Sequence, residues 1–184
     1  DASNTPAASK EAAPDAKTID NMIERANADH PRTDGREWQA SDILKNVVIT
    51  VKHPEDEEHD EPWREVIVVG VPGDRTVDMK RLEAQFAPAE LEEATEEDLK
   101  QHPELVPGYI GPMVLGPQAE AAGVKNPVRY LIDAHVVKGS AWFTGADENE
   151  VDYYNLVYGR DFKVDGVVEA VEVRHGDMSP DGSG

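Results

Sequence analysis

A loop near the middle of the chain combines two glycines and two prolines within residues 106–112. Gly108 and Gly111 lack a Cβ, so the backbone there can adopt positive φ and can approach a ligand closely. Pro112 has no backbone N–H and fixes φ at about −65°, which stiffens the exit from the loop. Carbonyls and amides of such a loop can hold an ammonium group or an ester. An ordinary connection of two turns has the same composition, so this alternative stays open.

Residues that could bind a metal form weaker patterns. His53 and His59 are separated by acids and could loosely hold a divalent cation, but a solvated acidic loop explains them better. Asp147, Asn149 and Asp152 supply oxygen atoms, yet the glycine and terminal glutamate of an EF-hand are missing. Phosphate loops, dinucleotide fingerprints, nucleophile elbows and His-Glu-x-x-His motifs are also absent from the sequence. We therefore expect no metal site.

Composition excludes several classes of protein. The 38 acidic and 18 basic residues give a net charge of −20, which argues against binding mainly through phosphate contacts. The absence of cysteine excludes a disulfide framework, a thiolate nucleophile and a cysteine-based zinc site. No apolar run reaches the roughly 18 residues of a membrane span, and the first residues lack the features of a signal peptide. The expectation is a soluble, cytoplasmic protein without membrane partners.

The elements that must position these residues are strands and short helices. The β-branched run at residues 47–51 predicts a buried strand. Strands are expected at residues 47–51, 64–71, 128–133, 151–157 and 167–173. Helices are expected from Thr18 or Asp20 to Ala26, from Ser41 or Asp42 to Leu44, over residues 77–86, from the capping box at Thr95, and over residues 134–143. This mixture predicts an α+β fold: a single domain with one mixed sheet of roughly six to seven strands surrounded by short helices.

Two segments are expected to lie in solvent, and a third is also rich in acids. Residues 1–17 contain no apolar side chain larger than alanine, so we expect a flexible N-terminal segment. Residues 54–61 include six acids, and residues 90–98 form a second acidic block. The first block is expected to be a solvated loop, and the second contains the capping box at Thr95 that opens a helix.

Six short segments and the C-terminal motif occur in an order that resembles a known family. The segments are residues 46–52, 69–74, 94–98, 107–112, 145–147 and 159–161. The closing Gly176-Asp177-x-Ser-Pro-Asp-Gly-x-Gly is the most specific of these motifs. Together they resemble the editing insertion domain of bacterial prolyl-tRNA synthetases. The resemblance implies a YbaK-like fold over residues 18–175, and it implies that residues 176–184 are the junction to the synthetase body.

The resemblance also implies catalytic residues. Gly108 and Pro112 match the family's Gly-x-x-x-Pro substrate loop, which makes Tyr109, Ile110 and Gly111 substrate-binding residues. Lys52 occupies the position of the family's essential lysine, where a compact ammonium could pair with the terminal phosphate or ribose of tRNA. A lone lysine at the surface is the alternative.

Two aspartates complete the implied site. Asp133 matches an aspartate of the family's substrate pocket, although it could equally be the N-cap of the helix expected after it. Asp152 stands where relatives have a histidine in the alanine pocket. An imidazole and a carboxylate differ in size, charge and donor capacity, so this departure changes the chemistry of the pocket or the local register.

Membership of this family would imply hydrolysis of mischarged alanyl-tRNA(Pro). A proline pocket cannot strongly reject a smaller amino acid, so a second site hydrolyses what is small enough to enter it. The reaction needs a positioned water and a polarised carbonyl, hence no cofactor in this domain, while the parent synthetase would use ATP and Mg. The expected partners are the 3′ end of tRNA(Pro) charged with alanine and the rest of the synthetase chain. The alternatives are a structural insertion of the same fold without editing activity, and an acidic protein- or cation-binding module.

Overall fold

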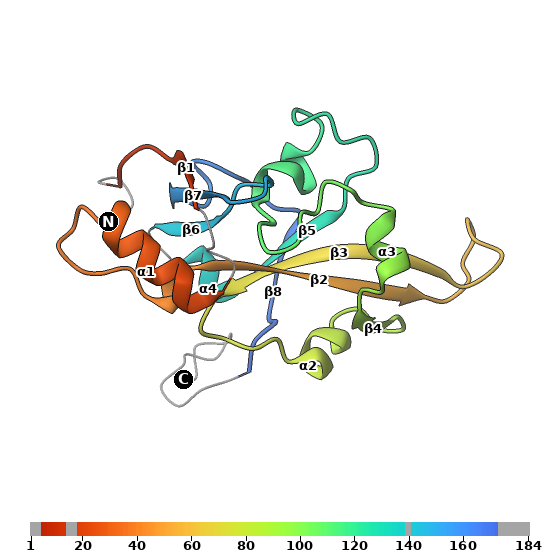
Figure 1. The fold of residues 1–184 in the computed structure, drawn as a ribbon. Coiled ribbons are helices and arrows are strands. Elements are labelled where there is room, and N and C mark those ends of the chain that lie inside the picture. Colours follow the sequence, from red (N-terminus) through yellow and green to blue (C-terminus); the bar gives the residue numbers. More distant parts are fainter. Residues whose placement is uncertain (1–4, 14–17, 139–140, 173–184) are drawn as a thin grey trace.

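The computed structural model describes residues 5–13, 18–138 and 141–172, which form two sheets and four short helices (Figure 1). The helices are α1 (Ile19–Asp29), α2 (Met79–Ala84), α3 (Glu96–Lys100) and α4 (Ala134–Val137). The strands are β1 (Ser9–Ala12), β2 (Leu44–His53), β3 (Trp63–Pro72), β4 (Glu90–Glu93), β5 (Arg129–Asp133), β6 (Trp142–Gly145), β7 (Val151–Leu156) and β8 (Gly166–Val168). The expected α+β class is therefore observed. None of the helices within the described ranges is both long and apolar enough to cross a membrane.

The long antiparallel pair β2–β3 forms the centre of the larger sheet, whose strand order is β4-β2-β3-β5-β8. Strands β3, β5 and β8 run parallel, whereas β4 runs antiparallel to β2. Alternate side chains of β2 and β3 enter two different hydrophobic clusters, so both faces of the pair are covered. Leu44 and Val68 belong to one cluster, and Ile49 and Val69 belong to the other. This double burial explains why residues 47–51 are apolar without alternation.

The smaller sheet has the order β1-β7-β6 and carries a third hydrophobic cluster beneath α1. An isolated parallel bridge between Ile43 and Phe143 joins its edge to the beginning of β2. The expectation of one mixed sheet with six to seven strands was wrong on this point: the described residues form eight strands in two sheets. Individual strands can be read from apolar patterns, but their partition between sheets depends on pairing over long range.

Two local expectations differ from the structure. Residues 9–12 were expected to be flexible, but they form β1, which pairs antiparallel with β7, and Ala13 beyond them is buried. The helix expected over residues 134–143 ends at Val137, and residues 142–145 form β6 instead. The expected junction at residues 176–184 lies outside the described residues.

Helix starts follow the expected caps. Thr18 accepts a hydrogen bond from the N–H of Asn21 at the start of α1. Thr95 and Asp98 form the predicted capping box at the start of α3. Asp98 also accepts hydrogen bonds from Thr50 and Arg64, and these contacts attach α3 to the central strands. The Arg64 guanidinium holds the pKa of Asp98 well below its usual range.

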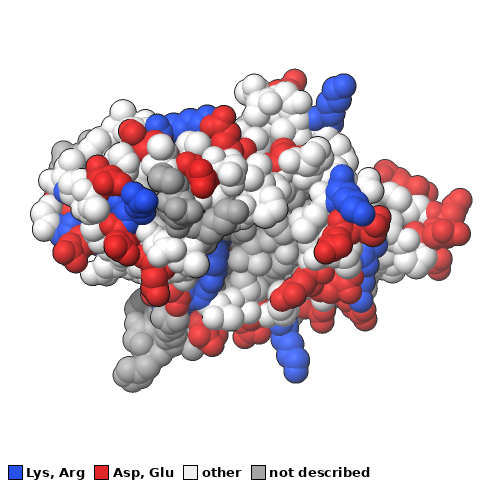
Figure 2. All heavy atoms as spheres, viewed as in Figure 1, with Lys and Arg blue, Asp and Glu red and all other residues white. Residues whose placement is uncertain are grey.

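The β2–β3 hairpin ends in the acidic loop, and acidic side chains gather at this end of the molecule, at the right of Figure 2. His53 and His59 each stack on Trp63 with ring centroids 4.1 Å apart. Each imidazole also contacts a carboxylate at 2.9 Å, from Glu65 and Asp56 respectively. Across the part of the chain that the structure describes, no three His, Asp or Glu side chains come together as a metal site.

Candidate functional site

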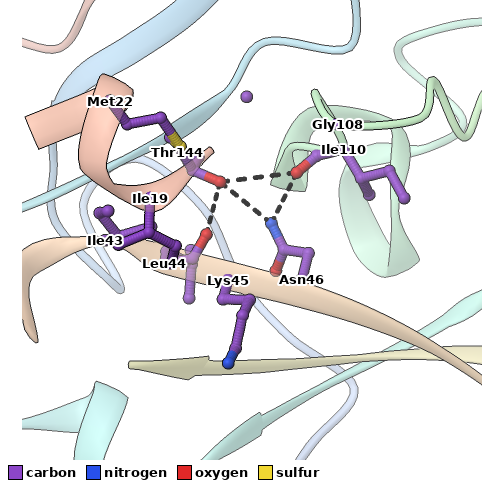
Figure 3. Close-up of a pocket in the computed structure, with 10 residues that line it drawn as sticks. Ile19, Met22, Ile43, Leu44, Lys45, Asn46, Gly108, Ile110 and Thr144 are labelled. Carbon is purple, nitrogen blue, oxygen red and sulfur yellow. Dashed lines mark hydrogen bonds between the residues drawn. The ribbon is translucent and has the colours of Figure 1, made fainter. Parts of the chain in front are cut away.

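A small pocket opens at the seam between the two sheets, beside the beginning of β2 (Figure 3). Its volume is about 190 Å³. It is lined by Ile19, Met22, Ile43, Leu44, Lys45, Asn46, Gly108, Ile110, Thr144 and Gly145. These residues come from α1, the start of β2, the loop of residues 106–112 (hereafter the Gly/Pro loop) and β6. The pocket is smaller than the 300–1,000 Å³ typical of sites for drug-sized ligands, so it suits a group as small as an amino acid.

The pocket exists because one end of β2 has a free edge. Strand β4 pairs only with residues 49–52 of β2, so it leaves residues 44–48 uncovered on that side. The hydroxyl of Thr144 donates to the carbonyl of Leu44 at 2.6 Å and so satisfies part of this edge from β6. The remaining space is closed by α1 and by the Gly/Pro loop.

A hydrogen-bond chain runs from the core to the loop through Asn46 (Figure 3). The hydroxyl of Tyr130 donates to Asn46 Oδ1 at 2.8 Å. Burial raises the pKa of Tyr130 far above its usual range, so this phenol stays protonated and remains a donor. The amide of Asn46 is therefore oriented with Nδ2 toward the loop, where it donates to the Ile110 carbonyl at 2.9 Å.

The Gly/Pro loop combines pocket residues with anchor residues. Gly108 has φ of +81°, a conformation that favours glycine, and it lines the pocket together with Ile110. Tyr109 is fully buried in the cluster beneath α1, and its hydroxyl donates to the Ala13 carbonyl at 3.2 Å. Gly111 donates its N–H to Asp147 Oδ1 at 2.8 Å. Pro112 is buried and begins a short 3₁₀ turn outside the pocket wall.

The structure does not bring Lys52 to this pocket. Lys52 is separated from Asn46 by six residues along β2, or about 20 Å at the rise of an extended strand. Its ammonium lies 3.5 Å from Glu90 and 3.6 Å from Glu92 of the neighbouring strand. The lysine of the pocket wall is Lys45, whose Nζ donates to the Arg75 carbonyl at 2.6 Å. Burial lowers the pKa of Lys45.

Asp133 is also outside the pocket wall. It is the N-cap of α4, and its Oδ2 accepts hydrogen bonds from both the N–H and the Nδ1 of His135. Its Oδ1 accepts from the N–H of Ala170 at 2.7 Å. Both carboxylate oxygens are therefore used within the fold, as the N-cap alternative anticipated.

Asp152 lies next to the pocket without lining it. It pairs across the β6–β7 ladder with Gly145, which is part of the pocket wall. Its side chain has no exposed surface, and neither carboxylate oxygen has a hydrogen-bond partner within the described residues. Burial raises the pKa of Asp152 to about 7.

Sequence reasoning missed three polar residues of the pocket, namely Lys45, Asn46 and Thr144. Asn46 offered a signal, because it is the one amide next to the apolar run at residues 47–51 and strands seldom contain Asn without a reason. Thr144 precedes the segment 145–147 that was singled out. Lys45 and Lys52 lie near opposite ends of β2, and only the position of the free edge shows which of them lines the pocket.

Comparisons with known proteins identify close relatives. The family model of the aminoacyl-tRNA editing domain matches residues 13–154. The chain is 99% identical over 184 residues to a Proline--tRNA ligase of Bifidobacterium longum and 75% identical over 187 residues to that of Bifidobacterium adolescentis. Identity to the Proline--tRNA ligase of Kineococcus radiotolerans is 51% over 179 residues. The chain spans 31% of the length of the two bifidobacterial relatives, while these matches cover 98–100% of the chain.

Solved structures share the fold at low sequence identity. A protein assigned as a trans-editing enzyme for prolyl tRNA synthetase superposes with a TM-score of 0.57 at 11% identity, covering 90% of this chain and 87% of that one. A crystal structure of a hypothetical protein matches with a TM-score of 0.59 at 12% identity, covering 90% and 92% of the two chains. The YbaK-like arrangement expected from the sequence is thereby confirmed.

Proposed function

The chain belongs to the aminoacyl-tRNA editing domain family, and we propose that it hydrolyses alanyl-tRNA(Pro) formed in error by a prolyl-tRNA synthetase of which it is a part. The similarity of the whole chain to one third of several proline--tRNA ligases supports this substrate. Its partners are then the charged 3′ end of tRNA(Pro) and the remainder of the synthetase, in the cytoplasm.

The size and lining of the pocket are the observation that carries the proposal. A volume of about 190 Å³ walled by Ile19, Met22 and Ile43 suits a methyl side chain. Apolar pockets discriminate between substrates that differ by one methylene by only ~1–3 kcal/mol. Selection by size would add to this discrimination: in the proposal the alanyl group enters the pocket and the larger prolyl group is held out by Ile19, Met22 and Ile43.

The Gly/Pro loop supplies groups that can polarise the ester. Tyr109 O, Ile110 O and Gly111 N–H are occupied by bonds within the fold. The N–H of Ile110 and the N–H and C=O of Gly108 make no hydrogen bond to the described residues. Backbone N–H groups held at a fixed position stabilise the oxyanion that forms when water attacks an ester. The proposed mechanism is therefore attack by water on a carbonyl polarised by the loop, with no metal assigned to the step.

We assign to Lys45 the role that the resemblance gave to Lys52. Lys45 is the lysine that lines the pocket, but its Nζ donates to the Arg75 carbonyl on the side of β2 opposite to Asn46 (Figure 3), so contact with a phosphate or ribose at the pocket mouth requires this bond to be exchanged. Lys52 is about 20 Å away from Asn46 and is already paired with glutamates.

The test is deacylation of alanyl-tRNA(Pro), measured for the 184-residue chain and for the full-length synthetase that contains it. We expect hydrolysis of alanyl-tRNA(Pro) and none of prolyl-tRNA(Pro). Lys45→Ala should reduce kcat/KM by about 10–100-fold, the size of a lost charge-assisted hydrogen bond. Lys52→Ala is the matched control and should remain within about threefold of the parent.

Each outcome has a definite meaning. Absence of hydrolysis by both proteins would leave the structural insertion without editing activity as the function. Hydrolysis that is lost in Lys52→Ala but kept in Lys45→Ala would restore the assignment that the resemblance made.

A further inference from the structure

The turn between β6 and β7 touches the Gly/Pro loop backbone against backbone. A Cβ built on Gly145 would lie 2.2 Å from the carbonyl carbon of Tyr109, and a Cβ on Gly111 would lie 2.0 Å from the carbonyl oxygen of Gly145. Real Cβ contacts are never this short, so both positions require glycine. The loop is therefore pressed directly onto the end of β6.

Asp147 holds the loop at two points on this contact surface. Its backbone N–H donates to the Tyr109 carbonyl at 2.8 Å, and its Oδ1 accepts the N–H of Gly111 at 2.8 Å. The two bonds attach on either side of Ile110, a residue of the pocket wall whose N–H makes no hydrogen bond to the described residues. Asn46 holds the Ile110 carbonyl from the opposite side. Of these three hydrogen bonds, the one from the Gly111 N–H is accepted by a carboxylate, that of Asp147.

The position of the Asp147 carboxylate is unfavourable for the stability of the fold. Its Oδ2 is buried and has no hydrogen-bond partner in the described part of the chain. Burial raises the pKa of Asp147 to about 7, which shows that its charged form is disfavoured where it sits. Asp147 also has φ of +64°, a conformation that is uncommon for non-glycine residues, although Asp adopts it more readily than most. Two unfavourable features at one residue commonly mark a functional position.

We propose that Asp147 is a positioning residue for the deacylation: its N–H and carboxylate fix the peptide units around Ile110 so that the free N–H of Ile110 points at the substrate ester. The inference rests on the proposed function. It extends that function to a side chain outside the pocket wall, which acts only through the loop backbone. Loss of the clamp should lower the rate of the chemical step more than the affinity for tRNA, because small misplacements of a polarising group cost rate.

The test compares Asp147→Ala and Asp147→Asn with the parent chain. The alanine variant loses the acceptor for Gly111, whereas the asparagine variant keeps an amide oxygen in nearly the same place. Asp78→Asn is the matched control, since Asp78 also accepts one backbone N–H, from Arg81 at 3.1 Å, but caps α2 away from the pocket. For each protein we would measure kcat and KM with alanyl-tRNA(Pro), the melting temperature, and hydrogen exchange of the Gly111 amide by NMR.

We expect Asp147→Ala to lower kcat by about 10–100-fold with KM within about threefold, while Asp147→Asn recovers to within about threefold of the parent. The Gly111 amide should exchange at least about tenfold faster in Asp147→Ala than in the other proteins. Asp78→Asn should match the parent in every readout. The melting temperature measures any global destabilisation separately, because alanine adopts the positive φ of Asp147 less readily than aspartate and also loses the bond from Gly111.

Unchanged kcat in Asp147→Ala, or an asparagine variant as impaired as the alanine variant, would overturn the positioning role. Gly111 exchange that is equal in parent and Asp147→Ala would overturn the clamp itself. This last measurement needs no substrate. If the parent fails to hydrolyse alanyl-tRNA(Pro), the proposed function fails while the exchange data still decide whether Asp147 holds the loop.

Discussion

Asp152 shows how the surroundings of a single residue change its chemistry. Its carboxylate has no exposed surface, and burial raises its pKa to about 7, against a value near 3.9 for an aspartate in an unfolded chain. Between pH 4 and pH 7 the folded chain therefore binds a proton that the unfolded chain has released. The free energy of unfolding contributed by this group falls as the pH rises through that window.

Replacing Asp152 by asparagine should remove this loss. We expect Asp152→Asn to unfold with a free energy higher than that of the parent by roughly 1–3 kcal/mol at pH 8, and the difference should vanish below about pH 4. Chemical denaturation at both pH values measures it. Asp60→Asn, at an exposed acid of the hairpin loop, should have no effect at either pH. A variant less stable than the parent at pH 8 would show that Asp152 is paired in solution.

At the scale of elements, α1 sets the size of the pocket. Its apolar residues follow helical spacing, and Ile19 and Met22 turn toward the pocket (Figure 3). Ile23 packs on the same hydrophobic cluster without lining the pocket. Substitutions at Ile19 and Ile23 can therefore separate the effect of the pocket wall on substrate selectivity from the effect of apolar packing on stability.

Shortening Ile19 should relax the size limit. We expect Ile19→Ala to admit larger aminoacyl groups, so that hydrolysis of prolyl-tRNA(Pro) relative to alanyl-tRNA(Pro) rises by about tenfold or more. Ile23→Ala controls for loss of apolar packing and should leave the ratio at its parental value. The ratio is measured at fixed salt with both substrates. A ratio that moves equally in both variants would mean that helix stability, not the pocket wall, controls it.

The elements that could be predicted are those with local signals. Thr18 and the Thr95–Asp98 capping box mark the starts of α1 and α3, because each cap bonds to a residue only three positions along the chain. The β-branched run at 47–51 marks β2. Strand β1 lacks such a signal, because it is stabilised by pairing with β7 far along the chain. Trp142 and Phe143 form an apolar run too short to separate strand from helix by its period.

The candidate site could be predicted only where glycine and proline in the sequence reveal an unusual backbone conformation. Gly108 and Ile110 were found through the Gly/Pro loop, and both line the pocket. Asn46 and Thr144 were missed because their role depends on which edge of β2 stays free. Lys45 and Lys52 have similar sequence surroundings, and the sheet order alone separates them.

At the scale of the whole molecule, the net charge of −20 opposes the approach of tRNA. Acidic side chains surround a largely uncharged hollow on the face shown in Figure 2. Several of the basic side chains are paired with acids, including Arg64 with Asp98 and Arg129 with Glu65. Repulsion between the domain and the nucleic acid should therefore outweigh attraction at low ionic strength.

Salt should consequently improve binding by the isolated chain. We expect KM for alanyl-tRNA(Pro) to fall by about twofold or more as monovalent salt rises from about 50 to about 200 mM, because screening weakens the repulsion. Proteins that bind through phosphate contacts show the opposite trend. Deacylation at constant Mg concentration across this range provides the measurement. A KM that rises steeply with salt would reveal a basic contact surface on this chain.

The pairing of β1 with β7 also constrains the order in which the domain folds during synthesis. Ser9 lies opposite Tyr154, so 145 residues separate the two partners along the chain. A ribosome adds about 5–20 residues per second, so the first strand waits roughly 7–30 seconds for its partner to be synthesised. Contacts of such long range form late and slow the folding of the chains that depend on them. Because β6 supplies Thr144 and Gly145 to the pocket wall, the pocket cannot be complete until most of the domain has left the ribosome.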